Sequence, residues 1–412
     1  MRCTNARTYA VSNATNNAGA TTGVAIVALL AVLGTAWGAS AQEDEDSEVF
    51  SSVEAGASIF VRGDTDRTVV ISPRASTSVT LADERTTVRG AYMADIWTSA
   101  SIDIRTAASV RRPRQAGEGE GTPARSITEQ RDQIDVSAQH EFDDVTIGAS
   151  YYFSGEHDYW SHGFGLRSVQ ELFGGSTTFE ESARFIHDTV GRAGDPNFSR
   201  PLESAGLRLV FTQILNPEAI LQVVYDGTYR TGFQSSPYRF VGLGGDGQCA
   251  GTATLCIPEV HPNERVRSAF VLRARFAFGE AASAGLGYRF YIDDWGVSSH
   301  TATAQIAWIP ARQQIITLRY RFYTQTAAGF YHSTYPELNP ANPVRFVTRD
   351  RELSPTFSNR LAISYQGTAR LTEDASMKLA LAVGGTAFVY PDFVGLEEVY
   401  AVDATFSVTL EL

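Results

Sequence analysis

An arrangement of aspartate, tryptophan and histidine occurs twice in this chain, each time within a few residues. Its six members are Asp158, Trp160, His162, Asp294, Trp295 and His300. Carboxylates and imidazoles bind metals or relay protons, and indole rings stack on ligands. The six residues therefore form one candidate ligand site. The alternative is structural, because tryptophan also lines the aromatic belt at a membrane interface, beside turns rich in aspartate.

Serine and histidine are neighbours at three places, 161–162, 299–300 and 332–333, which raises the question of nucleophilic catalysis. Adjacent residues of a strand point to opposite faces, so these pairs are poorly placed to form a Ser–His dyad. The sequence contains no nucleophile elbow, phosphate-binding loop or zinc signature. We therefore expect no enzymatic activity, no cofactor and no bound metal.

Two cysteines, Cys249 and Cys256, lie in a glycine-rich stretch, and a third, Cys3, lies near the start of the chain. An even pair of cysteines in an exported protein is typical of a disulfide. A metal site is the alternative, but two thiolates without a neighbouring histidine or third cysteine are too few for structural zinc. The even pair therefore favours a Cys249–Cys256 disulfide that constrains a surface loop.

Five arginines occupy alternating positions on strand-like segments, on the face opposite large apolar residues. They are Arg273, Arg275, Arg289, Arg319 and Arg321. If these strands close into a barrel in a membrane, the arginines face the lumen, where rings of Arg or Lys favour anions. The alternative is that they pair with inward acidic residues such as Asp226, Asp103 and Glu180, or with a loop folded into the lumen, and carry no solute.

The elements that must position these residues are β-strands, and the last segment shows this most clearly. From 399 to 412, apolar residues such as Tyr400, Phe406 and Leu412 alternate with polar ones such as Asp403. A strand of about ten residues with one apolar and one polar face is the unit of a transmembrane β-barrel. A terminal strand of this kind resembles the signal that bacterial outer-membrane proteins present to the barrel-assembly machinery. That signal usually ends in Phe, and Leu412 departs from it.

Alternation along the chain predicts sixteen strands. We expect them at 50–62, 68–82, 86–98, 130–142, 144–156, 160–172, 178–189, 204–215, 219–231, 265–278, 282–291, 298–309, 314–326, 356–367, 375–389 and 399–412. The longest connections, near 99–129, 190–203, 232–264 and 327–355, all follow odd-numbered strands, whereas even-numbered strands mostly lead into short turns. An even strand number with short periplasmic turns and long extracellular loops predicts an all-β, antiparallel transmembrane β-barrel.

The start of the chain predicts export. Arg2 and Arg7 precede an apolar run that ends in Ala39-Ser40-Ala41, which is typical of a secretory signal peptide at 1–41. We expect an acidic periplasmic segment at 42–49 and the barrel at 50–412. A single helical anchor is the alternative, but the apolar run is shorter than the roughly 20 residues that a span needs.

The acidic balance of the chain excludes one class of partner. The formal net charge is −12, and removal of the predicted signal peptide would make it two charges more negative. Phosphate contacts need Lys and Arg gathered on one face, so nucleic acid is not an expected partner. The expected partners are outer-membrane lipid and, during biogenesis, the barrel-assembly machinery.

Several motifs resemble the domain-of-unknown-function 3570 family, a set of bacterial outer-membrane barrels without an assigned activity. They include residues 95–101, 212–217 with Tyr225 and Tyr229, 232–239, 293–300 and 319–331. The resemblance covers about 50–412 and implies the barrel fold and an outer membrane, but no reaction.

Two functions remain open after these exclusions. The first is a channel or porin-like transporter of small solutes, which requires an open lumen. The second is a closed barrel that acts as a scaffold or receptor for a periplasmic or surface partner, with the 99–129 connection as the candidate filling of the lumen. That connection contains both basic and glycine-glutamate stretches, which favours a solvated segment over a plug.

Overall fold

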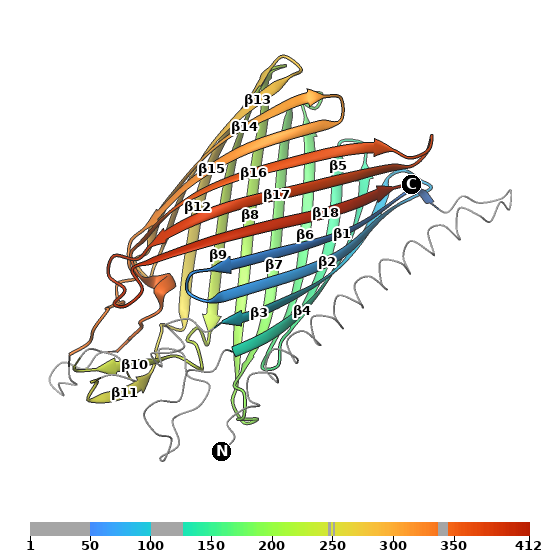
Figure 1. Cartoon of the computed structure of the whole chain (residues 1–412). Helices are drawn as coiled ribbons and strands as arrows, with labels where there is room; N and C mark the ends of the chain where they lie inside the picture. Colours follow the sequence, from blue (N-terminus) through green and yellow to red (C-terminus); the bar gives the residue numbers. More distant parts are fainter. Residues whose placement is uncertain (1–49, 100–126, 246–248, 250–251, 337–344) are drawn as a thin grey trace, which may run out of the picture.

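Sixteen antiparallel strands form one closed barrel in the computed structural model, which describes residues 50–99, 127–245, 249, 252–336 and 345–412 (Figure 1). The barrel strands are β1 (Phe50–Asp64), β2 (Thr68–Leu81), β3 (Thr86–Ser99), β4 (Ile127–Phe142), β5 (Val145–Gly155), β6 (Tyr159–Leu172), β7 (Thr177–Gly191), β8 (Ser199–Asn216), β9 (Ala219–Gly232), β12 (Glu264–Phe278), β13 (Ala282–Asp293), β14 (Ser298–Ala311), β15 (Gln314–Gln325), β16 (Thr356–Arg370), β17 (Ser376–Val389) and β18 (Glu398–Glu411). The predicted fold class and all sixteen predicted strands are confirmed, and β8 begins earlier than expected because its backbone still pairs with β7 there.

The first and last strands close the ring. Each barrel strand pairs with its neighbours along the chain, and β1 pairs with β18 in one continuous antiparallel register from Glu54↔Glu411 to Asp64↔Ala401. Closure satisfies the backbone hydrogen bonds of both edge strands, which no lipid could satisfy. The alternating sequence at 399–412 therefore belongs to the seam of the barrel.

The connections sort by length between the two ends of the barrel. Turns of a few residues join β2 to β3, β4 to β5, β8 to β9 and β14 to β15, at the end where the C-terminus lies (Figure 1). The long connections that follow β3, β9 and β15 all leave from the opposite end. Short turns mark the periplasmic end of bacterial barrels, so the long connections are extracellular.

The two faces of the sheet differ in chemistry. Large apolar side chains such as Leu166, Ile306 and Val402 point outward and are 66%, 60% and 62% exposed. Fully exposing such a side chain to water forgoes about 1.5–3 kcal/mol of burial, so an outer surface built from them requires lipid. Within the described ranges, no helix is long and apolar enough to cross a bilayer. The protein resides in the bacterial outer membrane.

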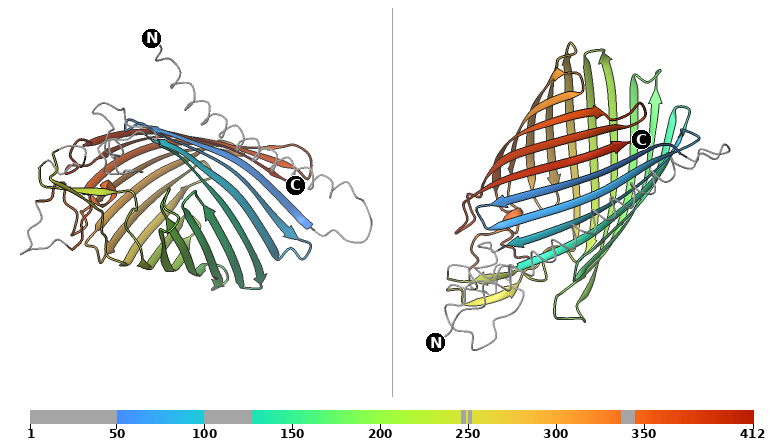
Figure 2. Two further views of the ribbon diagram at one scale, coloured as in Figure 1. Left: turned by 90° about the horizontal axis from the view of Figure 1, so that it is seen from below. Right: turned by 45° about the vertical axis from the view of Figure 1, so that its right-hand side comes forward.

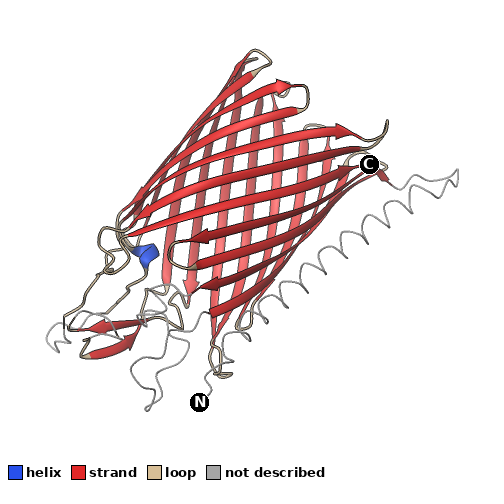
Figure 3. Cartoon of the chain, viewed as in Figure 1, coloured by secondary structure: helices blue, strands red, loops and turns tan. Residues whose placement is uncertain are grey.

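The longest described extracellular connections contain structure that alternation did not predict. Between β9 and β12, β10 (Phe240–Leu243) pairs with β11 (Leu255–Pro258), and Cys249 is disulfide-bonded to Cys256 as predicted. Between β15 and β16, a single 3-10 turn, η1 (Arg351–Leu353), is capped by Asp350. Both lie at the extracellular end (Figures 2 and 3). Strands of four residues carry too little periodicity to be found from sequence. The predicted signal peptide and acidic segment lie outside the described residues.

A charged pair inside the barrel shows how small residues organise the wall. Arg360 of β16 reaches across β17 to Asp403 of β18, with its Nη2 2.7 Å from the carboxylate Oδ2. A β-carbon at Gly384, on the strand between them, would collide with that guanidinium. Glycine therefore opens the route for the ion pair. Arg360 also lies directly opposite Arg321, so Asp403 offsets a contact between like charges.

We predict that Asp403→Asn destabilises the folded barrel by about 1–3 kcal/mol, because it leaves the Arg360 guanidinium without its charged acceptor beside Arg321. Urea-induced unfolding of the purified protein in lipid vesicles measures this loss. The double variant Arg360→Gln with Asp403→Asn removes both charges and should recover part of the stability. A double variant that is less stable than Asp403→Asn alone would contradict the assigned role.

Candidate functional site

The wall formed by β12 to β16 carries an unusual number of luminal arginines. Residues that pair directly across an antiparallel sheet share a face, and the register places nine arginines opposite the lipid-facing side chains. They are Arg265, Arg267, Arg273, Arg275, Arg289, Arg319, Arg321, Arg360 and Arg370. All five arginines predicted to face the lumen belong to this set. The same face of these five strands holds one carboxylate, Asp293.

Four of the five predicted arginines contact neutral groups. Arg273 donates to the Gln222 Oε1 at 2.9 Å, and Arg319 donates to the Gln305 Oε1 at 3.1 Å. Arg289 and Arg321 lie over the rings of Tyr291 and Tyr323 on their own strands. Within the described part of the chain, no carboxylate lies within ion-pair distance of any of the five. Their charges therefore remain available to the lumen.

The acidic partners considered from sequence are engaged elsewhere. Asp226 lies 3.6 Å from Arg208 on β8, and Glu180 lies 2.9 Å from Arg167 on β6. Asp103 lies outside the described residues. The idea that these acids neutralise the five arginines is wrong for Asp226 and Glu180. Asp226 is on β9 and Glu180 is on β7, and each pairs with an arginine of an adjacent strand instead.

The opposite wall has a different charge balance. In the order of strands around the ring, β4 stands across from β14, and β5 across from β15. The luminal face of β2 to β6 carries four arginines and five carboxylates: Arg74, Arg89, Arg131, Arg167, Asp95, Glu129, Asp135, Glu141 and Glu171. A wall rich in arginine thus faces a wall of mixed and slightly acidic character. Charge separated in this way produces a field across the lumen.

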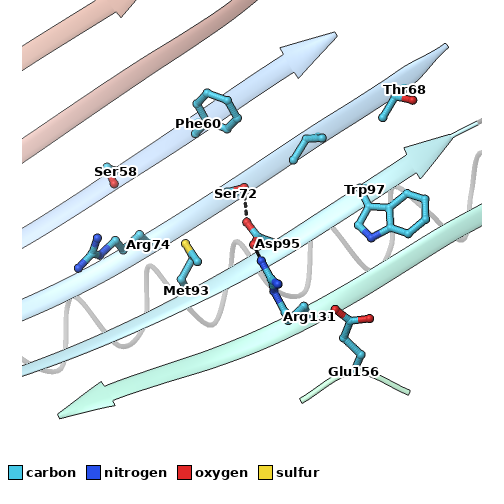
Figure 4. A pocket seen from close by; sticks show the side chains of 11 residues that line it. Ser58, Phe60, Thr68, Ser72, Arg74, Met93, Asp95, Trp97, Arg131 and Glu156 are labelled. Atoms are coloured by element: carbon cyan, nitrogen blue, oxygen red, sulfur yellow. Dashed lines mark hydrogen bonds and ion pairs between the residues drawn. The ribbon is translucent and has the colours of Figure 1, made fainter. Parts of the chain in front are cut away.

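A cavity of about 560 Å³ opens on the mixed wall, between β1 and β4 (Figure 4). Asp95 of β3 lies at its centre, where it accepts a hydrogen bond from the Ser72 hydroxyl and pairs with Arg131 at 2.5 Å. Trp97 and Phe60 supply apolar surface beside this pair. Glu156, just beyond the end of β5, also lines the cavity, and burial raises the pKa of its carboxyl group although Arg131 opposes the shift.

A second luminal cavity of about 490 Å³ lies at the extracellular end of the arginine wall, and we call it the outer vestibule. Four arginines line it, namely Arg230, Arg265, Arg267 and Arg289. Its remaining lining comes from β6 to β9, β13 to β15 and the extracellular connections, including Tyr159, Phe233, Tyr291, Tyr323 and Leu353. Only Arg289 of this group was anticipated from sequence.

The structure does not bring the six Asp, Trp and His residues together at one site. Trp160, His162 and His300 occupy positions whose register faces the membrane. Each of the two histidines accepts from or donates to a tyrosine across a strand pair: Tyr151 to His162 at 2.9 Å and Tyr288 to His300 at 2.6 Å. A phenylalanine ring lies beside each histidine as well. Trp160 and His162 are two residues apart on β6, so both lie on its outward face, and His300 lies on the outward face of β14.

The other three members of the group stabilise turns. The Asp158 carboxylate accepts from the Ala193 backbone, and the Asp294 carboxylate accepts from the Val266 backbone at 3.0 Å. Trp295 is buried in the β13–β14 turn, where its indole N–H donates to the Glu264 carbonyl oxygen. Among the described residues, no group of three or more His, Cys, Asp or Glu is placed to hold a metal ion.

The family of the chain follows from a comparison with protein-family models. The model described as "Protein of unknown function (DUF3570)" matches residues 22–202 and 199–365. The chain belongs to the DUF3570 family. The match spans most of the strands that carry the arginine wall, and it confirms the resemblance seen in the sequence motifs. No curated protein matches this DUF3570 barrel.

Solved outer-membrane structures are similar to the DUF3570 barrel at low sequence identity. CdiB from Acinetobacter baumannii is 10% identical, with a TM-score of 0.45 over 86% of this chain and 60% of that chain. A bacterial polysaccharide outer membrane secretin is 6% identical, with a TM-score of 0.48 over 88% and 99%. The deltaS2 mutant of the TodX monoaromatic hydrocarbon channel is 9% identical, with a TM-score of 0.39 over 87% and 89%. The DUF3570 barrel therefore spans less than two thirds of CdiB.

Three vestibule arginines, Arg230, Arg265 and Arg267, were missed from sequence and lie toward the extracellular ends of their strands. Arg265 and Arg267 continue the alternation of Arg273 and Arg275 on β12, so the same periodicity could have extended the wall. Arg230 lies near the end of β9, next to an extracellular connection. The cavity beside Asp95 depends on the successive pairing of β1 with β2, β2 with β3 and β3 with β4, which alternation within one strand does not reveal.

We predict that Trp295→Ala loosens the β15–β16 connection, which the structure describes over 326–336 and 345–355. The Trp295 ring packs against Phe330 and Leu353. The backbone carbonyl oxygen of Trp295 accepts from the Gly329 N–H at 2.8 Å. Loss of a buried tryptophan removes about 3–5 kcal/mol of packing, so limited proteolysis of the folded barrel should cleave this connection faster.

Trp308→Ala is the matched control, because Trp308 faces lipid near the periplasmic end of β14. Its proteolytic pattern should equal that of the unaltered protein. Equal cleavage rates for both variants would contradict the packing role of Trp295.

Proposed function

We propose that this protein is an outer-membrane channel for small solutes with a preference for anions. The observation that carries the proposal is the wall of nine luminal arginines on β12 to β16. These strands contribute one luminal carboxylate, Asp293, and the wall across the lumen has mixed charge. The overall charge of −12 does not conflict with this, because conduction responds to charges that line the lumen.

Burial and pairing decide how much of this charge a passing ion experiences. Arg319 contacts a glutamine oxygen and Arg321 lies over a tyrosine ring, and neither has a carboxylate at ion-pair distance among the described residues. An unpaired guanidinium attracts an anion, and salt weakens this attraction, because the Debye length is about 10 Å at 0.1 M. Anion preference should therefore be strongest at low ionic strength.

A closed barrel that binds a periplasmic or surface partner is the second candidate, and one observation favours it. The β15–β16 connection is tied to turns around half of the extracellular rim. Arg351 pairs with Asp66 of the β1–β2 turn at 2.9 Å, and the Tyr331 hydroxyl donates to the Asp392 carbonyl oxygen of the β17–β18 connection. Backbone bonds between Val347 and Val260 join it to the β9–β12 connection. Such a tied loop narrows the mouth of the barrel.

Single-channel conductance of the purified, refolded barrel in a planar bilayer separates the two functions. Stable current steps proportional to salt concentration support a channel. Absence of conductance from a barrel that still shows heat-modifiable migration would favour the closed scaffold.

We predict that the double variant Arg319→Glu with Arg321→Glu reverses the ion preference. The change replaces two luminal positive charges by two negative ones while both positions remain on the solvated face. The measurement is the reversal potential in a KCl gradient, and its sign should change.

A matched control reverses two arginines in periplasmic turns, Arg85→Glu with Arg312→Glu. This variant carries the same change in net charge but leaves the luminal wall intact, so its reversal potential should keep the original sign. If the luminal variant also keeps that sign, Arg319 and Arg321 do not govern selectivity.

A further inference from the structure

The outer vestibule has the size and shape of a ligand-binding cavity. Its volume of about 490 Å³ falls within the range of roughly 300–1,000 Å³ that small-molecule sites occupy. It is bounded below by β9, β12 and β13 and above by the extracellular connections that carry Phe233, Gln234 and Leu353. A solute that enters from outside meets this cavity before it reaches the middle of the arginine wall.

Two of the four vestibule arginines already have acidic partners. Arg265 donates through its Nε to the Asp293 Oδ2 at 3.0 Å, and its guanidinium stacks on the Trp295 ring at 4.1 Å. Arg230 lies 3.9 Å from the Asp188 carboxylate. These contacts fix the two side chains against the wall.

The other two arginines hold unused donors. Arg267 lies directly across from Asp293 in the β12–β13 register, but that carboxylate is occupied by Arg265. The Arg267 Nε is buried and has no hydrogen-bond acceptor among the described residues. Arg289 lies over the ring of Tyr291, and the described residues offer it no carboxylate at ion-pair distance. Arg267 and Arg289 both line the cavity, and neither has a carboxylate at ion-pair distance among the described residues, so an anionic group in the cavity would offset their charge.

The rest of the lining suits an apolar body. Val190, Leu202, Val297 and Leu353 are buried hydrophobic residues that face the cavity. Three tyrosines, Tyr159, Tyr291 and Tyr323, add flat rings with polar tips. An inorganic ion would leave this surface without contacts, whereas an organic acid would cover it.

The charge balance limits the ligand to a single anionic group. Of the two carboxylates that line the vestibule from above, Asp350 is paired with Arg239. Glu352 is exposed at the rim. Arg267 and Arg289 are therefore the two arginines of the vestibule without a carboxylate at ion-pair distance among the described residues, and one ligand carboxylate suits that pair.

We propose that the outer vestibule binds a small organic monocarboxylate, with the carboxylate held by Arg267 and Arg289 and the body packed against the tyrosines and Leu353. This inference deepens the proposed channel function, on which its role in transport rests. The vestibule would then make the channel selective for such acids and saturable by them. Binding itself requires no conduction.

Isothermal titration of the folded, detergent-solubilised barrel with benzoate tests the site. Benzyl alcohol has the same ring without the charge, and inorganic phosphate has charge without an organic body. We expect saturable binding of benzoate, and binding of the other two at least about tenfold weaker, because each lacks one half of the recognition. Equal binding of phosphate would replace the proposal by a simple oxyanion site, and equal binding of benzyl alcohol would exclude the arginines as the basis of recognition.

Arg267→Gln and Arg289→Gln should each weaken benzoate binding by about tenfold or more, since each removes a charge-assisted hydrogen bond. Arg275→Gln is the matched control: it lies on the same strand and the same face as Arg267, eight residues nearer the periplasm. Its affinity for benzoate should not change. Unchanged binding in both vestibule variants, or no binding to the unaltered barrel, would overturn the proposal.

Failure of the site and failure of the channel are distinguishable. Benzoate binding without any conductance would support the vestibule site and indicate that the barrel is a closed receptor. Conductance that responds to Arg319 and Arg321 without benzoate binding would keep the channel and remove the vestibule site.

Discussion

The fold depends on one constraint, which is that every backbone N–H and C=O inside a bilayer must be paired within the protein. The β1–β18 ladder meets it by joining the first strand to the last. Once the sheet is closed, side chains have only two destinations, lipid or lumen. The period of two then assigns each residue to one of them, so a single register determines the chemistry of both surfaces.

This sorting explains why an acidic protein contains a basic wall. A charge at the lipid-facing midplane costs about 2–4 kcal/mol, so arginines in the strands are directed into the lumen. They are not distributed evenly there, because nine lie on β12 to β16 with Asp293 as the one luminal carboxylate of those strands. Cross-strand contacts with glutamine and same-strand contacts with tyrosine hold several of these side chains without cancelling their charge.

The extracellular end is organised by packing between segments that are distant in the chain. Trp295 of one turn contacts Leu353 of another, and the Tyr331 hydroxyl donates to the Asp392 carbonyl oxygen of the β17–β18 connection. A tyrosine hydroxyl is protonated at physiological pH, and burial raises the pKa of Tyr331 further, to about 12. The β15–β16 connection is therefore a packed part of the molecule over its described residues, and it forms part of the roof of the outer vestibule.

The sequence determines the strands, their faces and their approximate ends, because alternation is a local property that the membrane enforces at every position. Alternation therefore predicted the barrel and the luminal side of Arg273 and Arg321. The even pair of cysteines separately predicted the disulfide at Cys249. The sequence also suggested a ligand site from Asp158, Trp160 and His162 that the register divides between a turn and the lipid face. The tertiary structure alone assigns Asp293 to Arg265 rather than to Arg267, and joins β9, β12 and the distant β15–β16 connection around one cavity. Such partners are selected by closure of the ring and by contacts between loops, neither of which leaves a periodic signal in the chain.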